Sequence, residues 1–250
     1  MTQDCQTIID FLGCDYELFE NEPDGAKICI RHEELWEQGL REGFTPLLIL
    51  VSDVLAEAME LSFEDADLEA DAENAAALRE DILQKAEAVD TDAFLSARLL
   101  EYTEMHEGDD ITGEFEDQEP VNFLLSINAK NDIPEIILAK IPTANPWELP
   151  AWIPMGGFND CPSPAEQVAV FRSWHERCGA VPDLVSYDVW EMELRGKEPV
   201  TDNAGAEALA KEQFAFCYDL VMQAFGQAFC GIRGLASRLK GSSTWYFWWD

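Results

Sequence analysis

The sequence predicts an α/β or α+β fold in which helices flank a mixed sheet. A continuous apolar run at residues 47–51 is typical of a strand that is buried on both faces. Segments with a helical period alternate along the chain with short apolar runs, as they do in α/β proteins. Hydrophobic residues make up 47% of the 250 residues and aromatic residues 11%, which is enough to form a core.

The N-terminal elements follow from local patterns of apolar residues. The elements expected before residue 64 are a helix, a strand, a helix, a strand and a helix, at residues 7–12, 26–31, 33–41, 47–51 and 53–61. The last of these helices follows the buried strand directly, and either Ser52 or Asp53 can cap it.

Acidic residues are concentrated in the first half of the chain. Residues 1–120 hold 34 of the 50 acidic residues but only 6 of the 16 basic ones. Ala75, Leu78 and Ile82 recur at helical spacing, which predicts an acidic helical insertion over residues 64–106. Residues 107–120 have turn residues and no apolar period, so we expect a surface loop there. It divides an acidic N-terminal half, 1–120, from a C-terminal domain, 121–250, unless the two form one continuous domain.

The C-terminal elements begin with a predicted hairpin. The expected elements are strands at 121–128 and 133–141 around a turn at 130–132, a Pro-rich ordered loop at 142–164, a helix at 164–178, a strand at 183–189, a helix at 203–240 that breaks near Gly226 or Gly231, and a strand at 244–249. In the last strand, Tyr246 and Trp248 should point to one face, and Trp245, Phe247 and Trp249 to the other.

Two helix–strand units share a weak sequence similarity, which we call the helix–strand echo. Gly43-x-x-Pro46 and Gly179-x-x-Pro182 each lead into a predicted strand, and each follows a helix that contains a tryptophan. The echo predicts a degenerate internal repeat.

The charge of the chain excludes several classes of partner. The formal charge is −34 and the isoelectric point is about 4.1, so the surface repels phosphates and anionic lipids. We therefore expect no direct binding to nucleic acid and no binding to membranes. Because no apolar stretch approaches the roughly 20 residues of a membrane span, and the start is not basic, a cytoplasmic location is expected. No nucleotide, zinc-protease or calcium-loop motif occurs, and no cofactor is expected.

The seven cysteines are expected to be reduced, because none forms a Cys-x-x-Cys pair. Two Cys/His pairs at three-residue spacing, Cys29 with His32 and His175 with Cys178, could together make a tetrahedral zinc site. In the strand predicted at 26–31, however, that spacing points the first pair to opposite faces. No metal site is therefore expected.

Several segments together resemble a known family. They are AKIPTANPWELPAWIPMGGFNDCP, Trp174-His175-Glu176, Gly179-Ala180, Asp188, the segment 208–219 and the terminal WYFWWD. The pattern resembles the bacterial domain of unknown function 4253 family over residues 121–250. Its motif positions in this chain are Asn159, Cys161, Glu212, Asp219 and Trp249. The resemblance implies no activity, although small bacterial proteins of such families often accompany toxins as immunity proteins.

One alternative is a thiol-dependent hydrolase or transferase. Cys161 would be the nucleophile and His175 the base, with Asp188 or Glu176 as the group that orients the base. Cys161 lies in a Pro-rich loop and does not open a helix, so nothing in the sequence lowers its pKa. No catalytic residue is therefore expected, and a buried structural thiol is favoured.

Two carboxylates, Glu212 and Asp219, lie seven residues apart in one predicted helix. They would therefore share a face after two turns, either as an acid and a base or as acceptors for loop amides. The second role is favoured, because the sequence places no other polar chemistry beside them.

The sequence favours a non-enzymatic binding protein of the immunity or inhibitor kind, whose acidic surface covers a basic partner such as a toxin. Opposite charge would speed encounter, and apolar anchors such as Trp36 or Phe63 would slow release. The expected partner-binding residues are Glu64, Asp65, Asp67, Glu69, Asp71, Glu73, Glu80 and Asp81. A second alternative is mimicry of DNA by rows of carboxylates.

Overall fold

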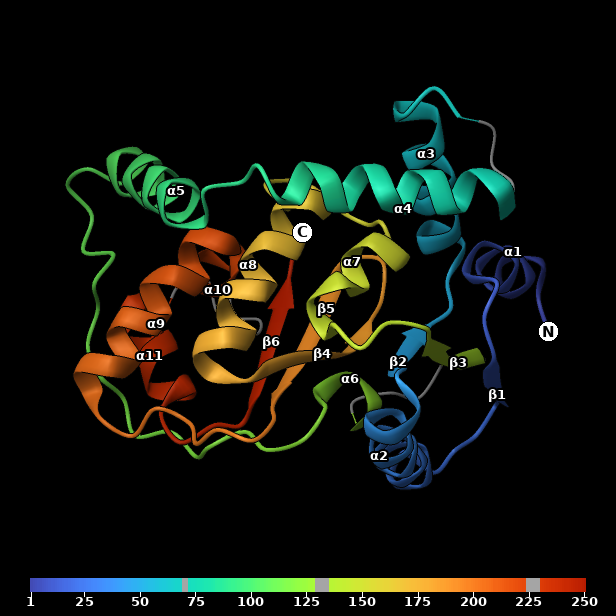
Figure 1. Ribbon diagram of the computed structural model, residues 1–250. Helices are drawn as coiled ribbons and strands as arrows, with labels where there is room; N and C mark the ends of the chain where they lie inside the picture. Colours follow the sequence, from blue (N-terminus) through green and yellow to red (C-terminus); the bar gives the residue numbers. More distant parts are fainter. Residues whose placement is uncertain (69–71, 129–134, 224–229) are drawn as a thin grey trace.

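A six-stranded mixed sheet lies at the centre of the molecule (Figure 1). The computed structural model describes residues 1–68, 72–128, 135–223 and 230–250, and the side chains of residues 72, 73 and 128 are not described. The strands are β1 (Tyr16–Glu20), β2 (Thr45–Leu50), β3 (Glu135–Ile141), β4 (Ala180–Val185), β5 (Val189–Leu194) and β6 (Thr244–Trp248). Their order is β1-β3-β2-β4-β5-β6, and only β2 and β4 pair in parallel. The predicted fold class is confirmed.

Strands from distant parts of the chain pair at the centre of the sheet. Leu48 of β2 lies opposite Leu138 of β3 on one side and Leu184 of β4 on the other. Alternate residues along these strands point to opposite faces, so that Leu48 packs in one hydrophobic cluster and Ile49 in another. Segments before and after residue 120 therefore share one sheet.

Helices cover both faces of the sheet unequally (Figure 1). The larger cluster lies under α1 (Gln3–Leu12), α3 (Asp53–Asp65), α4 (Ala72–Ala86), α5 (Thr91–Met105), α7 (Leu149–Trp152), α8 (Pro164–Cys178), α9 (Asn203–Phe216), α10 (Asp219–Met222) and α11 (Gly231–Leu239). The smaller cluster lies under α2 (Gly25–Glu42) and α6 (Leu125–Asn128). No helix in the described ranges is long and apolar enough to cross a membrane.

The strand predicted at 26–31 is wrong, because these residues lie in α2. The Asp24 carboxylate accepts hydrogen bonds from the amides of Ala26 and Lys27 and so begins the helix there. Ile28, His32 and Leu35 then fall on its buried face at helical spacing.

The predicted hairpin is also wrong. Residues 125–128 form the short helix α6, and β3 pairs with β1 and β2 instead of with residues 121–128. The turn predicted at 130–132 lies outside the described residues. Because both neighbours of β3 come from the first fifth of the chain, no local pattern identifies them.

Two further boundaries differ from the predictions. The strand predicted at 183–189 is the end of β4 and the start of β5, which pair in antiparallel fashion. The helix predicted at 203–240 ends at Phe216 and continues as α10 and α11. The break predicted near Gly226 lies outside the described residues, and Gly231 opens α11. The acidic helical insertion contains the end of α3 together with α4 and α5.

The predicted faces of β6 agree with the packing. Trp245, Phe247 and Trp249 are buried in the larger cluster, whereas Tyr246 and Trp248 pack against the smaller one. The helix–strand echo also has a structural counterpart. Gly43 and Gly179 both end helices in the left-handed conformation, and both lead into the parallel neighbours β2 and β4. The two preceding helices lie on opposite faces of the sheet.

Candidate functional site

A groove separates α3 and α4 from the loop that precedes α8. It consists of two adjoining pockets of about 380 and 220 Å³, which share Ser62, Asp65, Gly156 and Gly157. The larger pocket is also lined by Val54, Glu57, Leu61, Phe158 and Tyr187, and the smaller by Leu78, Asp81, Ile82 and Lys85. Helices from the acidic half and a loop from the C-terminal half thus form opposite walls.

The loop wall is held by buried hydrogen bonds. The side chain of Gln167, which is fully buried, donates to the carbonyls of Met155 (2.7 Å) and Pro162 (2.8 Å). Its own oxygen accepts from the indole of Trp190 at 2.8 Å. Gly156 adopts a φ of +128°, and a Cβ there would lie 2.2 Å from the Pro162 carbonyl oxygen. The chain therefore needs glycine at this position.

The groove combines negative charge with exposed apolar surface. Glu57, Asp65 and Asp81 contribute three carboxylates, and among the described residues only Asp81 of these three has a basic partner, Lys85 at 2.7 Å. Val54 is 40% exposed and Leu61 49% exposed on the α3 wall. Opposite α3, the ring of Phe158 on the loop stacks on that of Tyr187, which lies between β4 and β5, with the centroids 4.8 Å apart. This arrangement can hold a cationic side chain that has an apolar stem.

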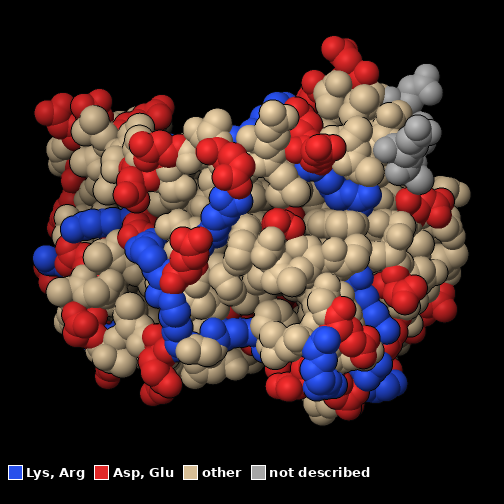
Figure 2. Space-filling view, in the orientation of Figure 1, with Lys and Arg blue, Asp and Glu red and all other residues tan. Residues whose placement is uncertain are grey.

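Five of the eight predicted partner-binding residues are described with their side chains, and they lie on and around this groove. Asp65 and Asp81 line it, while Glu64, Asp67 and Glu80 are exposed nearby on α3, on the turn after it and on α4. Glu69 and Asp71 lie outside the described residues, as does the side chain of Glu73. Figure 2 shows acidic side chains over the C-terminal end of α3, but also over α5 and other parts of the same face.

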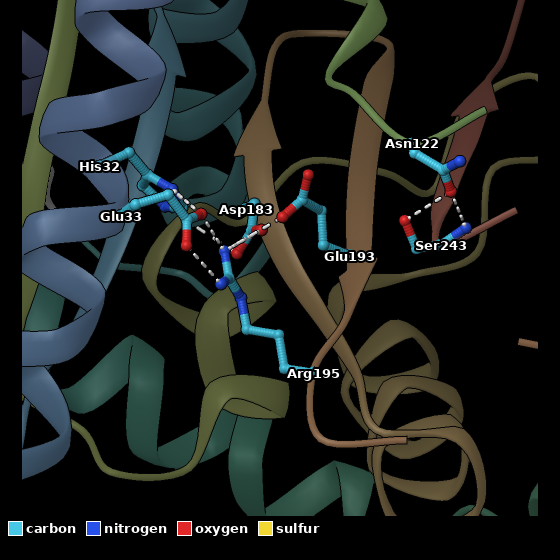
Figure 3. Close-up of polar contacts among 7 residues, drawn as sticks. All are labelled: His32, Glu33, Asn122, Asp183, Glu193, Arg195 and Ser243. Atoms are coloured by element: carbon cyan, nitrogen blue, oxygen red, sulfur yellow. Dashed lines mark hydrogen bonds and ion pairs between the residues drawn. The ribbon is translucent and has the colours of Figure 1, made fainter. Parts of the chain in front are cut away.

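A second cluster of charged residues lies between α2 and the strands β4 and β5 (Figure 3). Arg195 donates to Asp183 (2.6 Å) and Glu193 (3.2 Å), and it binds Glu33 with both terminal nitrogens (3.0 and 2.8 Å). Its guanidinium lies over the ring of Trp36 at 4.4 Å. The set is rigid, because one guanidinium fixes three carboxylates.

The environment shifts the pKa values of these carboxylates in opposite directions. Burial, together with the neighbouring charge of Asp183, raises the pKa of Glu193 to about 8. Contact with His32 and the hydrogen bonds from Arg195 lower the pKa of Glu33 to about 2. The cluster thus contains more negative charge than Arg195 alone neutralises.

The comparisons with known proteins concern the C-terminal part of the chain. Residues 137–250 match the family described as Domain of unknown function (DUF4253). This segment is a DUF4253 domain. The match confirms the resemblance predicted from the sequence. No curated protein and no solved structure matches the chain. The DUF4253 domain supplies the loop wall of the groove and, from the charged cluster, Asp183, Glu193 and Arg195.

The structure does not bring the predicted thiol triad together. Cys161 precedes α8, whereas His175 lies in its last turn, about 16 Å along the helix axis from its first residue, Pro164, at 1.5 Å per residue. The His175 ring nitrogen Nδ1 lies 3.1 Å from the Ala180 carbonyl oxygen, and Asp188 accepts from Ser186 and Trp248. Glu176 is exposed on α8. Burial raises the pKa of Cys161 well above its usual value, which opposes a nucleophilic role.

The four residues of the alternative zinc site are also not brought together. Cys29 and His32 lie on α2, on one face of the sheet, whereas His175 and Cys178 lie on α8, on the other. The carboxylates near His32 belong to Glu33 and Asp183 instead. In the described part of the chain, the group that could hold a metal ion therefore shares only His32 with the predicted set and adds Glu33 and Asp183.

The motif residues of the DUF4253 domain tie its C-terminal strand to neighbouring elements. The Asn159 side chain donates to the Asp250 carbonyl, and Asp219 accepts from the Asp250 amide at 3.1 Å. Trp249 is buried in the larger cluster.

Glu212 and Asp219 do not share one helix, because α9 ends at Phe216, so this prediction is wrong. Glu212 instead accepts from the indole of Trp174 and from Arg177, both at 3.0 Å.

Proposed function

We propose that this chain is a non-enzymatic binding protein that holds a cationic segment of a basic protein partner in the groove. The groove lies between α3, α4 and the loop of residues 153–163, which we call the Gly156 loop. The observation that carries the proposal is the composition of the groove, which places carboxylates beside exposed apolar and aromatic side chains. In its more specific, finer form, the proposal is that this chain neutralises a toxin, as an immunity or inhibitor protein does.

The groove suits arginine and lysine side chains for two reasons. Glu57 and Asp65 have no ion-pair partner among the described residues, so both are available to an incoming cation. The stems of such side chains can pack on Val54 and Leu61, which would slow dissociation. The net charge of −34 would in addition steer a basic partner toward the surface, and added salt would weaken this effect.

A charge-matched pair of variants tests the groove. The first variant is Glu57→Gln/Asp65→Asn/Asp81→Asn, and the control, Glu101→Gln/Glu104→Gln/Glu107→Gln, removes the same charge from exposed positions on and after α5. Binding of a fluorescein-labelled peptide of alternating arginine and leucine is followed by anisotropy. Three lost ion pairs of roughly 0.5 kcal/mol each should weaken binding by the groove variant about tenfold, with a smaller change in the control. Equal weakening in both variants would contradict a site in the groove.

The finer form of the proposal is tested with a protein encoded beside the gene for this chain. If that protein is basic and toxic, co-expression with the wild type should restore growth, the control variant should do the same, and the groove variant should not. Displacement of duplex DNA from such a partner, with no preference for the groove, would support DNA mimicry instead.

A further inference from the structure

Two buried polar atoms in the charged cluster under α2 face each other without a hydrogen-bond partner among the described residues. They are Nε2 of His32 and Oδ1 of Asp183, and they lie 3.9 Å apart. His32 is 1% exposed and Asp183 is fully buried. An unpaired polar group costs free energy when water is excluded, so the arrangement points to a ligand between the two atoms.

The charge of the cluster indicates what kind of ligand fits. Glu33, Asp183 and Glu193 surround the guanidinium of Arg195, so three carboxylates share one basic partner. The next carboxylate on β5, that of Glu191, is satisfied separately by the amides of Leu125 (2.5 Å) and Ser126 (2.7 Å). This surplus of carboxylates over basic groups would attract a cation.

We propose that His32, Asp183 and Glu33 bind a divalent transition-metal ion, with zinc as the ion that these donors favour. One ligand atom from each residue lies within 4.8 Å of the others, and together they supply an imidazole nitrogen and two carboxylate oxygens. Zinc accepts this mixture, whereas calcium and magnesium prefer oxygen alone. Two ligands about 2.1 Å from a tetrahedral zinc ion lie about 3.4 Å apart, so Nε2 and Oδ1 need to approach by only about 0.5 Å.

The surrounding residues already hold the ligands in place. Arg195 binds the second oxygen of Asp183, which orients the carboxylate and leaves Oδ1 free for the ion. The side chain of Glu33 is 54% exposed, so solvent reaches the cluster from this side and can supply a fourth ligand. Since His32 and Glu33 come from α2 and Asp183 from β4, the ion would join the N-terminal segment to the DUF4253 domain (Figure 3).

Metal titration of the chelator-treated chain tests the site. We expect calorimetry to show one zinc ion per chain, and magnesium chloride to give no binding. His32→Gln should weaken zinc binding at least about tenfold, and Glu33→Gln should weaken it severalfold. The matched control is Glu34→Gln, because Glu34 neighbours Glu33 but pairs with Arg31 on the exposed side of α2, and it should bind zinc as the wild type does.

Cobalt separates this site from the seven free cysteines, which can also bind zinc. Cobalt held by nitrogen and oxygen lacks the intense ultraviolet charge-transfer band of a thiolate complex. Absence of saturable binding, a thiolate band, or unchanged affinity in both His32→Gln and Glu33→Gln would overturn the proposal. If His32→Gln does not fold, the zinc affinity of Glu33→Gln alone tests the proposal, because residue 33 is half-exposed and tolerates the change. The groove variant should retain zinc binding, so the two proposals fail independently.

Discussion

At the scale of single residues, burial sets the chemistry of the cysteines. It raises the pKa of all seven thiols, for example to about 11 in Cys5, Cys14 and Cys29. We therefore expect the native chain to react slowly with an aromatic disulfide reagent at pH 8, because the thiolate is the reacting form. The denatured chain should react quickly and release seven equivalents of the reagent's aromatic thiolate per chain. A single fast thiol in the native chain, mapped to Cys161, would instead favour the hydrolase or transferase alternative.

Buried polar residues are the part of the candidate site that the sequence could not predict. Asp183 interrupts the apolar run of β4, which is a signal that it has a buried partner, but nothing local identifies that partner. Its ion-pair partner Arg195 comes directly after the next strand, β5, while Glu33 lies on a helix 150 residues earlier in the chain. Cys161, in contrast, is predictable from the sequence, which favours a buried structural thiol, and the structure buries it.

At the scale of elements, the Gly156 loop depends on one backbone conformation. Both Gly156 and Gly157 have positive φ, but only at Gly156 would a Cβ meet other atoms, those of Pro162 and Gln167. Gly156→Ala should therefore lower the free energy of unfolding by about 1–3 kcal/mol more than Gly157→Ala. Thermal unfolding of the two variants measures the difference. Equal melting temperatures would show that the loop relaxes without cost.

The elements that sequence predicts well carry their own signals. The helix α8 is predicted from its periodicity at its observed bounds, and the structure shows the local signals that set them, because Ser163 and Glu166 form a capping box and Gly179 ends the helix. β2 was predicted from an apolar run buried on both faces. The prediction failed at residues 26–31 because four apolar residues in six fit a strand as well as one face of a helix. The capping by Asp24 was the signal that distinguishes the two.

At the scale of the whole molecule, both proposed sites lie where distant segments meet. The groove joins α3 and α4 to the Gly156 loop, and the charged cluster joins α2 to β4 and β5. Because β3 lies between two strands from the first fifth of the chain, the acidic half and the DUF4253 domain are parts of one sheet. Long-range pairing of this kind leaves no periodic trace in a single sequence, so the sites could be recognised only after folding.

The net charge of −34 makes two opposite predictions for added salt. Raising sodium chloride from about 0.01 to 0.15 M shortens the Debye length from about 30 to about 8 Å. Repulsion among the carboxylates then weakens, so the melting temperature should rise, whereas binding of the cationic peptide should weaken. Scanning calorimetry and anisotropy on the same samples measure both. The Glu101→Gln/Glu104→Gln/Glu107→Gln variant, which repels itself less, should gain less stability from salt. A melting temperature that stays constant or falls with salt would show that the acidic surface is already neutralised by local pairing.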